Sequence, residues 1–374
     1  MTSNSVSRAY PPITILVPVY RNLQVTRACL ASLIDSDLPE NASIVVINDS
    51  SPETELSTFC SDMAARVGFR LLLNESNLGF VKTANRGFAL DPVADILLLN
   101  SDTIVSSDWL QRLQSCAYRE DSIGTVTPFS NNATICSYPV FPVSNELPTN
   151  WTVTELDQAF QLANSGSHLE IPTAVGFCMY IKRSCLNETG IFDEENFGLG
   201  YGEECDFSLR ASDLGWKNVV AADVFVFHKG EASFASEAME RKRFAGETMT
   251  KLHPNYQQLI SDFVQADPVY HFRKNVDAIR LKTKPHDSVA ILQEHFHYTS
   301  TILERTVDYH RAMVGEKEHR QYLEGLLEKC HQQIAANDRG VVSDLSREIE
   351  QLRAHINTIE QSRSWRYTQW FRRK

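Results

Sequence analysis

A chain of 374 residues is long enough for two or three domains, so we expect one large core with an appended segment. Its formal net charge of -11 excludes a general nucleic-acid binder, because neutralising phosphates requires a surplus of Lys and Arg. The 8 cysteines form no CxxC pair, which argues against a zinc ribbon or a disulfide framework and fits reduced thiols in the cytoplasm.

The sequence contains no recognisable targeting or membrane-spanning segment. Residues 1–12 lack the apolar core of a signal peptide. No uncharged apolar stretch approaches the ~20 residues that a membrane span requires. We therefore expect a cytoplasmic protein that is neither secreted nor transmembrane.

Apolar runs alternate with helix-like segments over the first 120 residues. The runs are ITILVPV (13–19), SIVVIN (43–48), FRLLLN (69–74) and DILLLN (95–100). Continuous apolar strands that alternate with amphipathic helices are typical of a parallel sheet covered on both faces. The pattern predicts a doubly wound α/β domain, in which ligands bind beyond the carboxyl ends of the strands.

Small polar residues follow each of these four runs. They are Pro18 to Tyr20, Asn48 and Asp49, Asn74 to Asn77, and Asn100 to Asp102. Because the carboxyl ends of parallel strands meet at one edge of the sheet, we expect these residues to converge on one binding site.

The middle of the chain changes character. Residues 128–170 are loop-rich, with one short helix indicated near 154–165. Apolar stretches at 173–190 and 218–230 predict further strands of the same domain. Between them, apolar residues at helical spacing, including Phe207 and Leu214, predict a helix that ends at Gly215.

Three positions have both a structural and a chemical interpretation. Asp102 or Ser101 could cap a helix beginning near Ser107, or Asp102 could bind a hard divalent cation. Glu203 and Glu204 could complement a helix dipole, or one of them could be a general base.

His228 completes the set of ambiguous positions. It could be a hydrogen-bonded core residue, or its imidazole could complete a metal site beside a carboxylate. No GxGxxG motif follows the first strand and no GxxxxGK[ST] motif occurs, which disfavours a Rossmann dehydrogenase and a P-loop kinase.

After about residue 235 the sequence is helical and charge-rich. Two short heptad seams, out of phase with each other, predict distinct helices or a broken coiled coil that could support a homo-oligomer. The seams comprise Leu323, Leu327, Cys330 and Ile334, and then Leu345, Ile349, Leu352, Ile356 and Ile359.

Several segments, taken in order, resemble a known family. They are PVYRNLQVTRACLASL, VVINDSSPE, NLGFVKTANRGF, ILLLNSDT, GFCMYIKRS, FDEENFGLGYGEECDFSLRASDLGW and HKGEASF. Together they resemble the inverting family 2 glycosyltransferases of the bacterial cell-surface polysaccharide type, such as rhamnosyltransferases of O-antigen synthesis. The resemblance covers about residues 13–234 and implies a GT-A fold, a Rossmann-like nucleotide-diphospho-sugar transferase fold.

The resemblance implies a role for each matching residue. NSD (100–102) matches the DxD metal motif, so Asp102 would hold Mn²⁺ or Mg²⁺ against the donor diphosphate, with His228 as a second ligand. Glu203 and Glu204 match the ED motif, whose second acid is the catalytic base. The positions that match the nucleotide-sugar pocket are Pro18, Tyr20, Asn48, Asp49, Asn77, Gly79, Asn85, Asn100 and Ser101.

The sequence departs from the family pattern at three of these positions. Asn100 replaces the first Asp of DxD, and Asn48 replaces an Asp that is common in the nucleoside-binding loop. Glu204 replaces the usual Asp of ED, so the choice between Glu203 and Glu204 as base stays open.

The resemblance implies transfer of a sugar from a UDP-, dTDP- or GDP-sugar to a hydroxyl of a glycan or lipid-linked acceptor. The alternative is a catalytically degenerate scaffold that acts through its coiled coil. The expected organisation is a flexible N-terminus (1–12), the transferase domain (13–234), a helical extension (235–310), a coiled-coil segment (311–362) and a tail (363–374).

The predicted tail has an unusual composition. Residues 363–374 interleave Arg and Lys with Trp, Tyr and Phe and contain no acid. Aromatic rings settle at headgroup depth and basic side chains attract anionic lipid. The tail therefore predicts peripheral attachment to the inner face of the cytoplasmic membrane.

Overall fold

The computed structural model describes residues 10–198, 200–230 and 235–305, with isolated residues beyond (321, 324–326, 328, 350 and 354). The side chains of residues 235–242 are outside this description. The chain divides into two compact units, Met1–Ser288 and Val289–Lys374. In the second unit residues 289–305 are helical. The predicted heptad seams and the basic tail lie outside the described residues.

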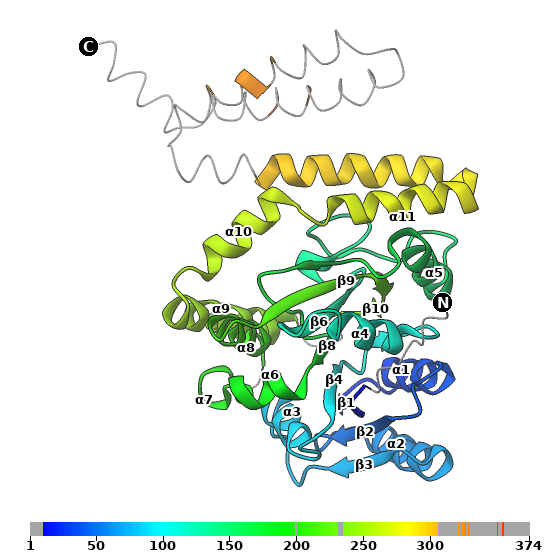
Figure 1. The fold of residues 1–374 in the computed structure, drawn as a ribbon, viewed down its shortest axis with the longest axis vertical. Coiled ribbons are helices and arrows are strands. Elements are labelled where there is room, and N and C mark those ends of the chain that lie inside the picture. The colour runs from blue at the N-terminus through cyan, green and yellow to red at the C-terminus, as the bar shows by residue number, and fades with distance from the viewer. Residues whose placement is uncertain are drawn as a thin grey trace, which may run out of the picture. The chain divides into compact units, whose positions relative to one another are not determined.

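The first unit is built on an eight-stranded sheet with the order β3-β2-β1-β4-β8-β6-β9-β7 (Figure 1). Its strands are β1 (Ile13–Val19), β2 (Ala42–Asn48), β3 (Arg70–Leu73), β4 (Asp95–Leu99), β6 (Ile123–Phe129), β7 (His168–Glu170), β8 (Cys178–Ile181) and β9 (Lys217–Phe225). A separate two-stranded sheet pairs β5 (Thr103–Ile104) with β10 (Phe227–His228).

Helices cover both faces of the large sheet, as the continuous apolar runs predict. In Figure 1, α1, α2, α4 and α5 lie on one side and α3, α6 and α8 on the other. The helices are α1 (Leu23–Asp35), α2 (Thr54–Val67), α3 (Phe80–Phe88), α4 (Trp109–Ala117), α5 (Val153–Asn164), α6 (Arg183–Thr189), α7 (Glu194–Phe197), α8 (Glu203–Asp213), α9 (Ala235–Leu252), α10 (Tyr256–Ala266) and α11 (Tyr270–Thr283). Two 3-10 turns, Thr134–Cys136 and Pro285–Asp287, complete the set.

The predicted α/β fold class is confirmed, but the sheet is mixed and not wholly parallel. β1 to β4 run parallel, whereas β8 is antiparallel to both of its neighbours, β4 and β6. β7 is also antiparallel to β9. An apolar run shows that a strand is buried but carries no information about its direction, so the sequence could not predict this reversal.

Close packing between α3 and β1 depends on a missing side chain. Val81, Ala84 and Phe88 of α3 are buried in the core that also contains Leu16. A Cβ added at Gly87 would lie 2.5 Å from Cδ1 of Leu16, so only glycine lets the helix approach the strand this closely. This contact fixes α3, and with it Asn85, against the sheet.

The helix predicted around residues 203–215 is confirmed as α8. Phe207 is fully buried, but Leu214 is the residue that caps the helix and its side chain is 55% exposed. Gly215 follows with φ of 90°, a conformation that favours glycine. Among the described residues, no helix is both long and apolar enough to cross a membrane.

Candidate active site

The loop after β2 is held in place by Asp49, which is 4% exposed. Its Oδ1 accepts hydrogen bonds from Nδ2 of Asn74 (2.6 Å) and the amide of Leu78 (2.8 Å), and its Oδ2 accepts one from the amide of Gly79 (2.9 Å). This carboxylate therefore ties the end of β2 to the turn that begins α3. Asp49 thus shapes the predicted nucleoside pocket by holding the backbone amides of Leu78 and Gly79 in place.

Asn48 and Asn77 also shape the loops at this edge. Oδ1 of Asn48 accepts a hydrogen bond from the amide of Ser51 (2.8 Å), and its Nδ2 donates to Oγ of Ser57 (2.9 Å). Oδ1 of Asn77 accepts a hydrogen bond from the amide of Gly79 (2.9 Å). The Asn48 amide group thus uses both its oxygen and its nitrogen to hold the loop that follows β2.

Asn85 connects α3 to the segment before α8. Its side chain accepts a hydrogen bond from the amide of Phe192 (3.0 Å) and donates to the carbonyl of Phe192 (2.9 Å) and to Oε1 of Glu194 (2.9 Å). Pro18 and Tyr20, at the end of β1, are partly exposed at the same edge of the sheet.

The NSD segment continues directly from β4. The amide of Asn100 donates to the carbonyl of Phe177 (2.8 Å), and its carbonyl accepts from Oγ1 of Thr103 (2.8 Å). Helix α4 begins at Trp109 with Asp108 as its N-cap, so the capping role considered for Asp102 and Ser101 is wrong. Oδ1 of Asn100 is buried and has no hydrogen-bond partner among the described residues.

The small sheet brings Asp102 and His228 together. Thr103 of β5 pairs with His228 of β10, and the amide of Lys229 donates to the carbonyl of Asp102 (2.9 Å). As a result Oδ1 of Asp102 lies 3.4 Å from Nε2 of His228, and the two side chains are 18% and 16% exposed. Two residues separated by more than a hundred positions in the sequence thus form one site.

The His228 ring is held in a defined tautomer. Its Nδ1 lies 2.8 Å from the carbonyl oxygen of Asn132. A carbonyl oxygen only accepts hydrogen bonds, so Nδ1 carries the proton, and in the neutral ring Nε2 presents a lone pair towards Asp102. Burial lowers the pKa of His228, but Asp102 and the Asn132 carbonyl outweigh burial, so the pKa lies above its ordinary value of 6.5.

These donors fit a divalent cation. An imidazole lone pair and a carboxylate that face each other at 3.4 Å repel, and either a proton on Nε2 or a divalent cation bound by both groups relieves this repulsion. Nitrogen and oxygen ligands of this kind suit Mn²⁺, and one or two protein ligands suffice when phosphate and water supply the rest. Within the described parts of the chain no cluster of three or more His, Cys, Asp or Glu residues that could hold a metal ion is present.

Glu203 and Glu204 are the first two residues of α8. Glu203 is 4% exposed, and Glu204 is partly buried. Oε2 of each carboxyl group is buried without a hydrogen-bond partner in the described structure. Burial and the neighbouring charge of Glu204 raise the pKa of Glu203 well above 4.5, and burial raises the pKa of Glu204. Carboxyl groups with raised pKa values in a cleft are candidates for acid–base catalysis.

The two residues just before β8, Gly176 and Phe177, lie between Glu204 and the Asp102–His228 pair. A Cβ added at Gly176 would lie 3.4 Å from Cγ of Glu204, so the Gly176 backbone lies against this side chain. The next residue, Phe177, accepts the Asn100 hydrogen bond and stacks on His228, with ring centroids 5.0 Å apart. Glu204 therefore lies at the same edge of the sheet as the Asp102–His228 pair.

The start of α8 is held by side-chain contacts of Asp206, one of them to the residue that follows α9. Oδ1 of Asp206 lies 2.8 Å from Nε2 of His253, and its Oδ2 accepts from Nε of Arg210 (2.8 Å). Gly202, the N-cap of α8, has φ of 91°, and a Cβ there would lie 3.0 Å from Cε1 of Phe197. The sequence did not indicate the part played by His253, because helix periodicity does not show which helix packs on α8.

The buried Glu203 carboxyl predicts an unusual dependence of stability on pH. The contribution of a raised pKa to the stability of the folded state is fully present below the ordinary value of about 4.5, and it is lost progressively between that value and the higher folded-state pKa. Within that window the free energy of unfolding should fall by at most about 1.4 kcal/mol per pH unit. Glu203→Gln should reduce this dependence to the part that comes from the raised pKa of Glu204, and urea denaturation between pH 4 and 8 measures the change.

A matched control for this experiment is Glu195→Gln. Glu195 lies in α7 and is exposed. The Glu195→Gln variant should follow the wild-type pH profile. If the Glu203→Gln profile also matched wild type, the Glu203 carboxyl would not be responsible for the pH dependence.

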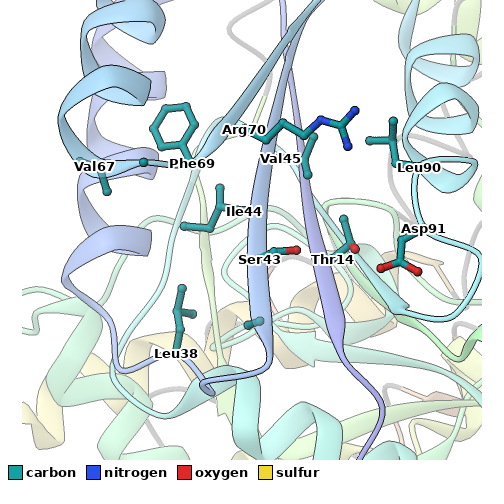
Figure 2. Close-up of a pocket in the computed structure, with 12 residues that line it drawn as sticks. Thr14, Leu38, Ser43, Ile44, Val45, Val67, Phe69, Arg70, Leu90 and Asp91 are labelled. Carbon is teal, nitrogen blue, oxygen red and sulfur yellow. The ribbon is translucent and has the colours of Figure 1, made fainter.

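A hollow of about 450 Å³ lies at the opposite, amino-terminal edge of the sheet (Figure 2). Its lining includes Thr14 of β1, Ser43 of β2 and Arg70 of β3, together with Asp91 from the connection before β4. These positions are at the beginnings of the strands. The hollow is therefore separate from the candidate active site.

Comparison with known families identifies the class of protein. The model of the family described as "Glycosyltransferase like family 2" matches residues 11–246. This match covers more than half of the chain, so the chain belongs to this family. Family membership agrees with the observed α/β sheet and with the GT-A fold that the sequence motifs predict.

Two bacterial relatives are similar over part of the chain. An uncharacterized protein of Mycobacterium tuberculosis is 31% identical over 123 residues, which cover 32% of this chain and 36% of that protein. An uncharacterized glycosyltransferase of Haemophilus influenzae is 25% identical over 113 residues, or 30% of this chain and 35% of that protein. The matched region thus spans about a third of the length of each relative.

Two solved structures are also similar. The mannosyltransferase PcManGT from Pyrobaculum calidifontis, in complex with GDP-Man and Mn²⁺, gives a TM-score of 0.49 at 13% identity over 84% of each chain. TarS 1-349 of S. aureus, in complex with UDP-GlcNAc, gives a TM-score of 0.47 at 16% identity over 82% of this chain and 85% of that one.

Proposed function

We propose that the chain is a metal-dependent, inverting glycosyltransferase that moves a sugar from a UDP-, dTDP- or GDP-sugar to a hydroxyl group. The observation that carries the proposal is the Asp102–His228 pair, with Oδ1 and Nε2 3.4 Å apart at the carboxyl edge of the sheet. Ligands of open α/β sheets bind at this edge. Membership of glycosyltransferase family 2 supports the same function.

Asp102 and His228 would hold the cation, with the donor diphosphate as its further ligand. When bound, Mn²⁺ or Mg²⁺ neutralises the charge that develops on the leaving nucleoside diphosphate. The protein's own contribution is to fix both ligands: the β5–β10 pairing sets their separation, and the Asn132 carbonyl leaves Nε2 of His228 free to act as a ligand.

Glu204 is proposed to act as the general base. Its carboxylate would take the proton from the acceptor hydroxyl as that oxygen attacks the anomeric carbon, while the bond to the diphosphate breaks on the opposite face. A single displacement inverts the anomeric configuration. Glu204 is partly buried and lies against Gly176, and burial raises its pKa above 4.5, which makes the carboxylate a stronger base.

We propose that the acceptor is a growing cell-surface glycan or a lipid-linked glycan, as in the rhamnosyltransferases of O-antigen synthesis that the sequence motifs resemble. The loop-rich segment 130–151 lies beside the site, because it contacts His228 through Asn131 and Asn132. A long irregular connection at the rim of an active site is a natural place for acceptor recognition.

A donor screen tests the proposed function. Purified protein is incubated with Mn²⁺ and each of several UDP-, dTDP- and GDP-sugars, and release of nucleoside diphosphate is measured with and without a chelator. We expect release with one nucleotide class, dependent on the metal, and ¹H NMR of the product should show the inverted anomer. Absence of both turnover and nucleotide binding across the panel would favour the scaffold alternative.

Membrane attachment is a separate proposal that concerns the basic aromatic tail. Truncation before Ser362 should abolish flotation with vesicles containing anionic lipid, because each basic residue near the surface contributes about 1 kcal/mol of binding free energy. Neutral vesicles are the control, and full-length protein should float with them less. Equal flotation of the full-length and truncated chains on anionic vesicles would show that the tail is not the anchor.

A further inference from the structure

Asn131 holds both backbone groups of His228. Its Oδ1 accepts a hydrogen bond from the amide of His228 (2.8 Å), and its Nδ2 donates to the carbonyl of His228 (3.0 Å). The Asn131 side chain is 3% exposed. Since no other side chain described in the structure bonds to both backbone groups of His228, Asn131 fixes the β10 backbone against the loop that contains Asn131 and Asn145.

The neighbouring residue, Asn132, orients the imidazole ring. Its carbonyl oxygen accepts the Nδ1 proton of His228 at 2.8 Å. The ring also stacks on Phe177, with ring planes 18° apart. A hydrogen bond at one end of the ring and a stacked neighbour on its face leave one direction for Nε2, which is towards Asp102.

The Asn131–Asn132 pair is itself held by the rest of its loop. Nδ2 of Asn131 donates to the carbonyl of Asn145 (2.9 Å), and the Asn145 side chain donates to the carbonyl of Asn131 (3.2 Å). Ser130 forms an isolated bridge with Ser137. The Asn145 amide also binds the backbone of Val140 and Val143, so it braces the loop without contacting His228.

The same loop is anchored to helix α11, which lies beyond the family match. The hydroxyl of Tyr138 donates to Oδ1 of Asp277 (2.7 Å) and accepts from Nη1 of Arg280 (2.9 Å). Arg280 is fully buried and also pairs with Asp287 (2.8 Å). A buried, paired network of this kind is costly to break, so it fixes the loop rigidly.

We propose that Asn131 is a positioning residue for the metal site: it places His228 so that Nε2 faces Asp102 as a metal ligand, and the Asn132 carbonyl fixes the tautomer. The inference rests on the proposed function for the identity of the ion. Partners that orient a metal-binding histidine typically alter metal affinity by about 10- to 100-fold when they are removed. Helix α11, which lies outside the residues matched by the family model, helps to hold the same loop through the hydrogen bonds of Tyr138 with Asp277 and Arg280.

The first test compares Asn131→Ala with Asn145→Ala in the full-length protein. Mn²⁺ alone is titrated and the free ion is followed by electron paramagnetic resonance, with thermal unfolding measured in parallel. We expect Asn131→Ala to weaken Mn²⁺ binding by about 10- to 100-fold and Asn145→Ala to lower the melting temperature with Mn²⁺ affinity near wild type. Equal losses of Mn²⁺ affinity in both variants would overturn the proposal, because loop integrity alone would then explain them.

A second measurement needs no variant to fold. Long-range ¹H–¹⁵N NMR of the metal-free wild-type protein, at a pH where the His228 ring is neutral, reports which nitrogen carries the proton. We expect the Nδ1–H tautomer, and an Nε2–H tautomer would overturn the positioning role. If wild type showed the Nδ1–H tautomer but bound no Mn²⁺, the positioning of the ring would stand and the metal-dependent function would fail.

Discussion

Glu204→Gln is expected to lower the rate of sugar transfer by about 10³-fold, with Mn²⁺ and donor binding retained. Removing a general base typically costs 10² to 10⁴ in rate, and glutamine keeps the shape of the side chain while losing its ability to take a proton. Steady-state kinetics with the donor identified by the screen measures the change, and calorimetry measures donor binding.

Two comparisons make this result specific. Glu203→Gln should reduce the rate less, because Glu204 is the acid whose side chain lies against Gly176, beside the NSD segment. Asp213→Asn, which alters an exposed acid at the far end of α8, should leave the rate unchanged. A larger loss in Glu203→Gln than in Glu204→Gln would assign the base to Glu203.

The pH dependence of the wild-type enzyme supplies a further readout of the same residue. Burial raises the pKa of Glu204, and a base acts only when it is ionised. The rate should therefore fall as the pH drops through this raised pKa, above the ordinary carboxyl value of 4.5. The residual activity of Glu204→Gln should lack this acidic limb.

Asp102→Ala is expected to abolish metal-dependent turnover, with a loss of about 10³-fold or more. A bound cation contributes several kcal/mol to stabilising charge on the leaving group, and each tenfold change in rate corresponds to about 1.4 kcal/mol. Removing Asp102 leaves His228 as the single ligand of the Asp102–His228 pair. Mn²⁺ affinity and nucleoside diphosphate release, measured on the same preparation, should fall together.

Asp108→Asn is the matched control for this substitution. Asp108 lies six positions later, caps α4 and pairs with Arg112 on the protein surface, with its side chain 46% exposed. Its replacement should change neither Mn²⁺ affinity nor turnover. Unchanged Mn²⁺ affinity in Asp102→Ala would contradict the assignment of Asp102 as a metal ligand.

Much of the fold could be predicted because each strand of the first half reads as a continuous apolar run. The four runs that end at Val19, Asn48, Asn74 and Asn100 correspond to β1 to β4, and all four run parallel. The direction of β8 could not be predicted, since side chains alternate between the two faces of a strand and are buried in the same way whichever direction the strand runs. Yet this reversal is what brings Gly176 and Phe177 to the edge where Asn100 lies.

The candidate site was only partly visible in the sequence. Asp102 and His228 each follow an apolar run, and the structure places them 3.4 Å apart. Asn48, Asp49 and Asn85 were expected to line the donor pocket, and in the structure their side chains bond to the protein itself. Polar residues at strand ends indicate an edge that binds something, but their spacing does not distinguish a residue that contacts a ligand from one that shapes a loop.

Asn131 shows the limit of sequence patterns most clearly. It stands in the loop-rich segment 128–170, well before the one helix that the sequence indicates there, and its contact with His228 spans 97 positions. Local propensity favours Asn in turns for many reasons, so the residue alone predicts only a loop. Its role follows from the strands that bring the two segments together.

The two-residue β5–β10 sheet also determines when the site exists during folding. The pairing of Thr103 with His228 closes a long loop that contains β6, β8 and β9, and closing so long a loop is entropically costly before the large sheet has formed. The site should thus be among the last parts of the domain to assemble. A cation held by both Asp102 and His228 would bind only the folded protein. Saturation with the metal would therefore stabilise the folded state relative to partly folded states.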